Sequence, residues 1–377
     1  MSLINEETVG LARTPVYWLL GLPFDLVDTE AAIQHIDSAV RDRQSLVFAT
    51  PNVNFFALAG RSRTFLINVL RTDLSFVDGM PLVWLGRMLG IPFRERVSGS
   101  SLLERIIDRG ISVPIRLFFF GGEEGVSEAA SVRVNNSHPN VGAVGALSPG
   151  FGSVDELSTA EILDQVNSAE ADFLVVALGA EKGHEWIARN RDALSVSVVS
   201  HLGATVNFLA GTVRRAPRIM QAIGFEWLWR IYEEPKLIAR YFRDGLFFCR
   251  ILLLNAMPVV LGRLFGQLFG QKDIRFVCVS SDRDSLELRG LFLEECVGTV
   301  SAAIWERIDG GATRVRIDLS QVTALDCRSI GFLYELRFRQ LIPVRVELVG
   351  NGRSLESILN RHRAEILLQN MTETSDD

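Results

Sequence analysis

The chain has 377 residues, of which 48% are hydrophobic and 22% charged, a composition typical of a globular protein with about two or three domains. Its net charge of −6 at pH 7 lacks the basic bias of nucleic-acid-binding proteins, so no nucleic-acid partner is expected. Four cysteines without a Cys-x-x-Cys pair predict buried, reduced thiols, and five histidines without ligand spacing predict no metal site.

Apolar runs of strand length alternate with helical patterns from residue 46 to residue 211. The runs are LVFA (46–49), LSFV (74–77), IRLFFFGG (115–122), DFLVVALG (172–179) and VSVVSHLG (196–203). Strands that are apolar on both faces and alternate with helices predict an α/β fold with a Rossmann-like, doubly wound, mostly parallel sheet. The spacing of apolar residues over 54–70 predicts a helix there.

Polar residues follow the first two apolar runs. Thr50, Pro51 and Asn52 come after LVFA, and Asp78 and Gly79 come after LSFV. Open α/β sheets bind ligands at the carboxyl ends of their strands, so we expect Asp78 to be a catalytic base. Other runs end in glycine, as expected where the backbone approaches a ligand. These ligand-edge glycines are Gly121, Gly122, Gly179 and Gly203.

The composition changes at Arg214, where a basic and aromatic helical stretch leads into the apolar segment 245–270. The uncharged run between Arg250 and Arg263 has 12 residues, whereas a spanning helix needs about 20. This favours an interfacial helix or hairpin, with a buried core helix as the alternative. The basic residues could form a solvated helix face, contact anionic lipid or bind a diphosphate.

A second α/β unit begins near Asp273, with the pattern β-β-α-β-α-β-α. We predict a catalytic domain over 1–212, a basic, membrane-associating appendage over 213–270, a separate domain over 273–370 and a disordered tail over 371–377. The stretch 266–272 is the predicted linker. The N-terminus lacks a signal-peptide pattern, so a cytoplasmic location at the inner face of the membrane is expected.

Residues from about 15 to 245 resemble the WecG/TagA/CpsF family of bacterial glycosyltransferases. The matching motifs include TPN (50–52), VDG (77–79), RVSG (96–99), FFFGG (118–122), PGFG (149–152), GATVNFLAG (203–211), RRAP (214–217) and FEWLWRIYEEPKLIARY (225–241). The resemblance implies metal-independent, inverting transfer of a sugar from a UDP-sugar to a polyprenyl-diphosphate-linked saccharide at the membrane. The sugar would be of the N-acetylmannosamine, uronate or glucose type. No cofactor is implied, and a homo-oligomer is compatible with the family.

The resemblance assigns Asp78 as the general base, with Thr50, Asn52 and Arg96 lining the pocket beside it. Gly79 and the ligand-edge glycines would contact the substrates. Four arginines are expected to bind the acceptor diphosphate or the membrane: Arg214, Arg215, Arg218 and Arg240.

The chain departs from the family at the expected donor pocket. Gly183 and His184 stand where the family has Gln and Glu, and Ser101 and Asn207 stand where it has Asp. His184 is interpreted as a surface or helix-capping residue, with a replaced ligand contact as the alternative. Retention of Asp78 favours an active enzyme with an altered donor pocket.

Residues 273–370 resemble a STAS domain, through the stretch RVRIDLSQVTALDCRSIGFLYEL at 314–336. Cys327 occupies the position of the serine that kinases phosphorylate in switching members, and Ser329 is displaced from it. A constitutive protein-binding role and a simple packing module are both open. The alternative function for the whole chain is therefore regulatory, with a degenerate transferase fold presenting this domain to a partner.

Overall fold

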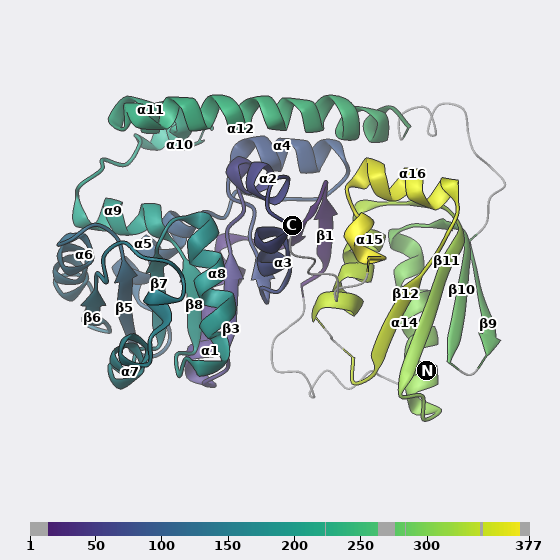
Figure 1. Ribbon diagram of the computed structural model, residues 1–377, viewed down its shortest axis with the longest axis horizontal. Helices are drawn as coiled ribbons and strands as arrows, with labels where there is room; N and C mark the ends of the chain where they lie inside the picture. The colour runs from purple at the N-terminus through teal and green to yellow at the C-terminus, as the bar shows by residue number, and fades with distance from the viewer. Residues whose placement is uncertain (1–13, 223, 263–275, 283, 340–341, 370–377) are drawn as a thin grey trace. The chain divides into compact units, whose positions relative to one another are not determined.

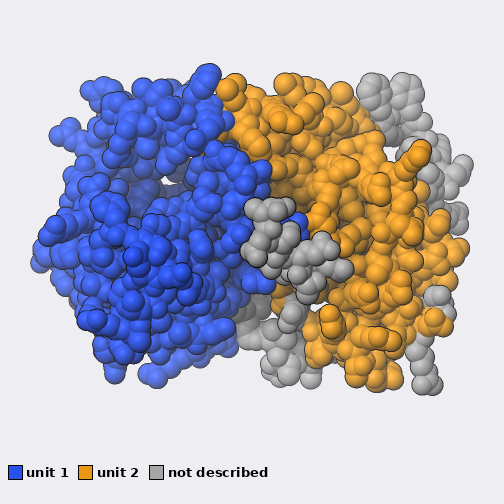
Figure 2. All heavy atoms as spheres, in the orientation of Figure 1, with its two compact units in different colours: residues 1–14, 27–83, 93–243 blue, residues 15–26, 84–92, 244–377 orange. Residues whose placement is uncertain are grey.

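A computed structural model describes residues 14–222, 224–262, 276–282, 284–339 and 342–369. The chain divides into two compact units, coloured separately in Figure 2. Unit 1 contains Val27–Val83 and Phe93–Arg243, and unit 2 contains Pro15–Leu26, Trp84–Pro92 and Asp244–Asp377. The predicted appendage 213–270 is thus shared by both units, and the predicted domain boundaries stay a prediction. The predicted linker 266–272 and tail 371–377 lie outside the described residues.

Unit 1 contains a six-stranded sheet in the order β4-β3-β8-β7-β5-β6, with every neighbouring pair parallel (Figure 1). The strands are β3 (Leu46–Ala49), β4 (Leu74–Ser75), β5 (Ile115–Gly121), β6 (Val141–Leu147), β7 (Phe173–Ala177) and β8 (Val198–His201). The predicted doubly wound parallel sheet is confirmed. β8 lies between β3 and β7, so strands distant in sequence meet at the centre.

Helices cover both faces of this sheet. Successive strand residues point to opposite sides, and both sets are apolar, so each face needs a layer of helices to bury it. Phe119 packs into one core, and its neighbours Phe118 and Phe120 pack into the other. The first core contains residues of α1 (Thr29–Arg41), α5 (Gly99–Arg109), α6 (Val126–Asn135) and α9 (Gly203–Ala210). The second contains residues of α7 (Ala160–Ser168) and α8 (Ala180–Asn190). Burial on both faces explains why these strands are continuously apolar.

The helix predicted over 54–70 is two helices, α2 (Val53–Ala59) and α3 (Arg63–Leu70). Gly60 ends α2, and Ser62 caps α3 by accepting a hydrogen bond from the Phe65 N–H (3.2 Å). The apolar periodicity continues across this break, which is why the sequence pattern hid it. α4 (Met80–Met88) begins directly after Asp78 and Gly79.

The basic and aromatic stretch forms α10 (Arg218–Ala222), α11 (Glu226–Glu233) and α12 (Ile238–Ile251). A π-helical turn over Leu252–Ala256 follows α12, and Pro258 explains it, since proline cannot donate to the carbonyl four residues earlier. The helical segment Pro235–Gly262 is long and apolar enough to cross a membrane. Only 17% of its most apolar window is buried, so the core-helix alternative is wrong for the described part of the predicted segment 245–270, whose residues 263–270 lie outside the described residues.

Unit 2 contains a four-stranded mixed sheet in the order β12-β11-β10-β9. Its elements follow the predicted order: β9 (Val277–Asp282), β10 (Ser285–Phe292), α14 (Glu294–Asp309), β11 (Arg314–Leu325), α15 (Cys327–Tyr334), β12 (Arg345–Val349) and α16 (Arg353–His362). β9 and β10 are antiparallel, whereas β10, β11 and β12 are parallel neighbours.

Unit 2 also contains an N-terminal hairpin of β1 (Val16–Leu19) and β2 (Leu22–Asp25), which packs on α15. The Trp18 indole N–H donates to the His362 carbonyl (2.9 Å), and both terminal nitrogens of Arg339 reach the Asp25 carboxylate at 2.7 Å. The Arg339 and Asp25 side chains are 9% and 1% exposed, so this bidentate pair is buried. The hairpin is therefore part of the core of unit 2.

The prediction of buried thiols holds for Cys327 alone. Cys249 is exposed on α12, and Cys278 and Cys296 are partly exposed. Cys249 lies on the long apolar helix that buries little of its surface, which explains its exposure.

Candidate active site

Backbone hydrogen bonds bring together three motifs that are separated in sequence. The Asp78 N–H donates to the Pro51 carbonyl (3.0 Å), which joins the end of β4 to the end of β3. The Val97 N–H donates to the Val77 carbonyl (2.9 Å), which places the RVSG segment beside them. The TPN, VDG and RVSG motifs therefore form one local structure at the carboxyl edge of the sheet.

Asp78 is half-buried within a set of charged side chains. Burial raises the pKa of this carboxyl to about 7, and the negative charge of Glu226 acts in the same direction. The positive charges of Arg96, Arg230 and Arg215 lower the pKa and limit the shift. A carboxyl that titrates near neutral pH can accept a proton and release it again, as a general base must.

Arg96 and Glu226 form an ion pair at 2.5 Å, and both side chains are largely buried. Glu226 belongs to α11, so the appendage contributes a charge to the surroundings of Asp78. The sequence analysis did not assign Glu226 to the site, and it considered Arg230 only as part of the basic stretch that follows Arg214. The signal available was the aromatic FEWLWRIYEEP motif, which contains both residues.

Arg215 is the predicted appendage arginine that lies near Asp78. Its guanidinium pairs with Glu104 and donates to the Ser101 hydroxyl (2.6 Å), so the RRAP motif contacts α5. Ser101 also accepts a hydrogen bond from Ser98 (2.8 Å). A serine in place of the expected Asp therefore leaves Arg215 with Glu104 as its carboxylate partner.

The other appendage arginines make different contacts. Arg214 is exposed, and its carbonyl accepts a hydrogen bond from the Trp229 indole (3.0 Å). The Arg240 guanidinium lies over the Tyr241 ring, 5.2 Å from its centre. The Arg218 side chain lies outside the described part of the structure. The roles predicted for these three residues stay predictions.

Thr50 and Asn52 lie at the end of β3, next to Asp78 in the strand order. Thr50 is 8% exposed and faces Gly99, where a Cβ would lie 3.4 Å from the Thr50 hydroxyl oxygen. Asn52 caps α2 by accepting a hydrogen bond from the Asn54 N–H (3.0 Å). Asn52 thus has a local structural role beside any contact with substrate.

The ligand-edge glycines lie at the carboxyl ends of β5, β7 and β8. Gly121 has a φ of +98°, and a Cβ there would meet the Ala177 carbonyl oxygen at 2.8 Å. Gly179 precedes α8 with a φ of +82°, and Gly203 is the first residue of α9. Gly79 (φ +130°) and Gly122 (φ +86°) also adopt backbone that favours glycine. Helix N-termini at this edge suit the binding of phosphate.

His184 is buried (2% exposed), so its interpretation as a surface or capping residue was wrong. Its ring packs edge-on against Phe55 and Phe65 at 5.3 and 5.7 Å between ring centres. His201, which the sequence analysis did not select, lies 5.7 Å from it at the end of β8. A Cβ at Gly183 would overlap the His201 ring, so Gly183 makes the space that His201 fills.

Both histidines are neutral at physiological pH. Burial lowers the pKa of His184 to about 3, with a smaller contribution from His201, and burial lowers the pKa of His201 to about 4. The Nε2 atom of each ring is buried and has no hydrogen-bond partner among the residues that the structure describes. Asn207 lies half-buried on the neighbouring helix α9.

Among the residues that the structure describes, no group of three or more His, Cys, Asp or Glu side chains could hold a metal ion.

Comparison with known proteins places this geometry in context. A family model described as the glycosyl transferase WecG/TagA/CpsF family matches residues 17–259. A relative from Bacillus spizizenii, named N-acetylglucosaminyldiphosphoundecaprenol N-acetyl-beta-D-mannosaminyltransferase, is 24% identical over 216 residues, 56% of this chain and 81% of the relative. A Staphylococcus aureus relative of the same name is 23% identical over 237 residues, 62% of this chain and 90% of the relative.

Proposed function

The chain belongs to the WecG/TagA/CpsF family of glycosyltransferases, and on that premise we propose that it transfers a sugar from a UDP-sugar to a polyprenyl-diphosphate-linked acceptor. The names of the relatives support an N-acetylmannosamine-type donor and an acceptor that carries N-acetylglucosamine. The uronate and glucose types of donor stay open, because the residues around Gly183 differ from those expected for the family.

The observation that carries the proposal is the carboxylate of Asp78 among three arginines. In an inverting transfer, Asp78 removes the proton from the acceptor hydroxyl as that oxygen attacks the anomeric carbon and the UDP oxygen leaves. The pKa of about 7 leaves about half of the Asp78 carboxyl ionised at neutral pH. The enzyme can therefore hold a competent base without a metal-bound hydroxide.

The arginines near Asp78 supply the second requirement, stabilisation of the phosphate charge. Arg96, Arg215 and Arg230 act on Asp78 electrostatically, so an anionic diphosphate in the same place would experience the same positive charges. Guanidinium groups bind phosphate through paired N–H donors. Glu226 and Glu104 hold two of these arginines in the absence of substrate, and we propose that a diphosphate competes with them.

We also propose that unit 2 contains a STAS-like domain. Its order of strands and helices and the cap of α15 support this, since the Asp326 carboxylate accepts from the Ser329 N–H (2.8 Å) and the Ser329 hydroxyl interacts with the Asp326 backbone. Ser329 is fully buried and Cys327 is 4% exposed. A phosphorylation switch at either position is therefore unsupported, and a constitutive role in packing or partner binding is favoured.

A donor screen with a lipid-diphosphate-linked N-acetylglucosamine acceptor tests the proposed function. UDP-N-acetylmannosamine, its uronate and UDP-glucose are compared by the appearance of the extended lipid product. We expect transfer from one of them and release of UDP. Binding of UDP without transfer from any donor in the panel would contradict the proposal. Absence of both binding and transfer would favour the regulatory alternative, in which the fold presents unit 2 to a protein partner.

A further inference from the structure

Exposed large apolar side chains gather on the long helix that begins at Pro235. Within unit 2 this helix carries the exposed residues Leu246, Leu253, Leu254, Met257 and Leu261. A helix that exposes this many large apolar side chains is typical of a segment that inserts into lipid. The same segment is long and apolar enough to span a membrane.

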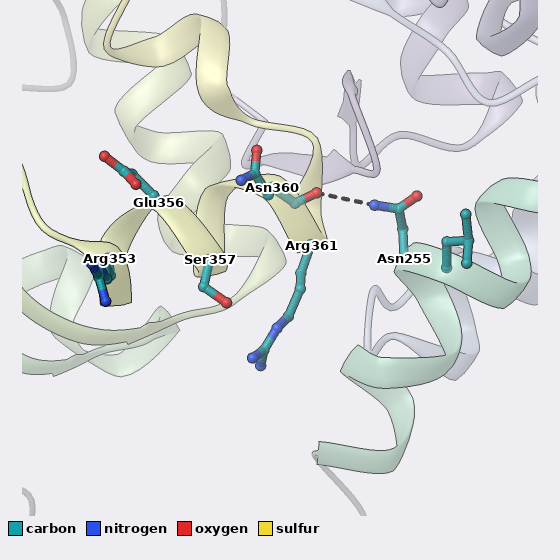
Figure 3. A pocket seen from close by; sticks show the side chains of 7 residues that line it. Asn255, Arg353, Glu356, Ser357, Asn360 and Arg361 are labelled. Atoms are coloured by element: carbon teal, nitrogen blue, oxygen red, sulfur yellow. Dashed lines mark hydrogen bonds between the residues drawn. The ribbon is translucent and has the colours of Figure 1, made fainter.

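An open pocket of about 380 Å³ lies beside this apolar surface, within unit 2. One side of the pocket comes from Leu254 and Asn255 on the helix, and the other side comes from α16 (Figure 3). The Asn255 amide donates to the Asn360 carbonyl (3.0 Å), which ties the helix to α16 at this point. The pocket is therefore positioned by a defined contact between the two elements.

The α16 side of the pocket is basic and polar. Arg353, Ser357 and Arg361 recur every four residues, so they share one face of the helix. Figure 3 shows Ser357 and Arg361 pointing to the same side, whereas Glu356 points to the opposite side. Neither Arg353 nor Arg361 forms an ion pair with any residue in the described part of the chain.

A third arginine adds to this positive charge. Arg250 is exposed and lies one helical turn before Leu254. Burial is the main cause that lowers the pKa of Arg363, and the positive charge of Arg250 lowers it further. Arg250 therefore lies close enough to the end of α16 to add to its positive charge. The pocket is lined by two arginines and one carboxylate, Glu356, so its lining keeps a net positive charge beside an exposed apolar helix.

From this juxtaposition, we infer that the pocket between α16 and the 252–262 segment binds the phosphate of an anionic phospholipid while the apolar helix contacts the acyl chains. A soluble anion would need the arginines but not the leucines. A phospholipid uses both, because its phosphate and its hydrocarbon chains are joined in one molecule. The α16 side of the pocket thereby provides a second membrane contact within unit 2, in addition to the apolar helix.

The inference rests on the proposed membrane association and not on sugar transfer, so a binding assay without donor or acceptor tests it separately. The full-length protein is co-sedimented with vesicles of phosphatidylcholine, with or without phosphatidylglycerol. We expect Arg353→Gln/Arg361→Gln to bind the anionic vesicles about 25-fold more weakly, because each arginine near such a surface contributes about fivefold. Binding to neutral vesicles should be unchanged.

The matched control is Arg314→Gln/Arg345→Gln. These two exposed arginines face each other at the starts of β11 and β12, whereas α16 follows the end of β12. This control removes the same charge from the same unit and should retain most of the anionic binding. An equal loss in both double variants would overturn the inference in favour of nonspecific charge attraction.

A further arm separates lipid from soluble phosphate. Thermal unfolding is measured with inorganic phosphate for the native protein and for Arg353→Gln/Arg361→Gln. We expect inorganic phosphate to change the unfolding temperature of both proteins equally, because the pocket should not bind free phosphate. If phosphate stabilises only the native protein and both proteins partition equally onto vesicles, the pocket is a soluble-anion site and the lipid assignment is wrong.

Discussion

Two regions of the ligand edge in unit 1 differ in their chemistry. At the β4–β3 end, Asp78 lies among arginines and Glu226, in a polar and charged environment. At the centre, near β8 and β7, two neutral histidines lie side by side, and the Nε2 atoms of His184 and His201 are buried without partners among the described residues. The same scaffold therefore carries one region built on charge and another built on packing.

Because of this difference, substitutions in the two regions should affect different properties of the protein. The charged region contains several groups that shift the pKa of Asp78, so a substitution there should alter the pH profile. The histidine region depends on volume, since the ring of His201 occupies the space left by Gly183. A substitution there should alter stability first.

The largest effect is expected for Asp78→Asn, which removes the base and keeps its volume. Loss of a general base costs about 10²–10⁴-fold in turnover. We expect kcat to fall by that amount while UDP still binds, measured by initial rates and by ligand-induced thermal stabilisation. Asp108→Asn, at an exposed position on α5, is the matched control and should leave turnover unchanged. Near-native turnover in Asp78→Asn would remove Asp78 from the mechanism.

A smaller effect, on stability, is expected for Gly183→Ala. The added methyl group overlaps the His201 ring, and overpacking of this kind costs about 1–3 kcal/mol of unfolding free energy. In a His201→Ala background the same change should stabilise the protein by about 0.5–1 kcal/mol, because alanine favours the helix. Urea unfolding of the native protein, Gly183→Ala, His201→Ala and the double variant measures both free-energy changes.

Gly298→Ala is the control for this pair, because Gly298 is also helical and has open space at its Cβ position. Gly298→Ala should stabilise both the native protein and the His201→Ala variant. A destabilisation by Gly183→Ala that persists without the His201 ring would show that the clash has another source.

The smallest effect is expected for Glu226→Gln, which acts through the pKa of Asp78. Since the charge of Glu226 raises this pKa, its removal should lower it from about 7. The activity requires the ionised carboxyl, so it rises with pH to a plateau, and the variant should reach that plateau at lower pH. Arg96→Gln should move the profile in the opposite direction, because Arg96 lowers the pKa. The pH dependence of kcat/KM measures both shifts.

The same titration predicts a trend in stability. The folded carboxyl of Asp78 retains its proton up to about pH 7, whereas the unfolded carboxyl loses it near 3.8. The folded state therefore loses stability as the pH rises through this window, and Glu226→Gln should reduce that loss. An unchanged slope in the variant would argue that Glu226 does not act on Asp78.

Much of the fold could be predicted because strands buried on both faces leave a strong local signal. LVFA at 46–49 and DFLVVALG at 172–179 form strands as predicted. The helix break at Gly60 was missed, since a cap at Ser62 does not interrupt the apolar period. Polar residues at strand ends likewise pointed to the sheet edge, where Asp78 and Thr50 lie.

The rest of the site depends on contacts between residues far apart in sequence. The environment of His184 comes from Phe55 and Phe65, which are more than 100 residues away, so its burial could not be predicted from its own helix. Glu226 lies 130 residues from Arg96. Pairings of this kind follow from the three-dimensional fold and leave no periodic pattern in the chain.

The N-terminal hairpin has a consequence for synthesis of the protein. Val16, Trp18 and Asp25 are synthesised well before their partners Arg328, His362 and Arg339, which lie 312, 344 and 314 residues later in the chain. The hairpin therefore cannot complete its contacts in the core of unit 2 until residue 362 has been translated. A nascent chain stopped before residue 328 would leave Trp18 without the His362 carbonyl and Asp25 without Arg339, so the hairpin would lack its packing partners in unit 2.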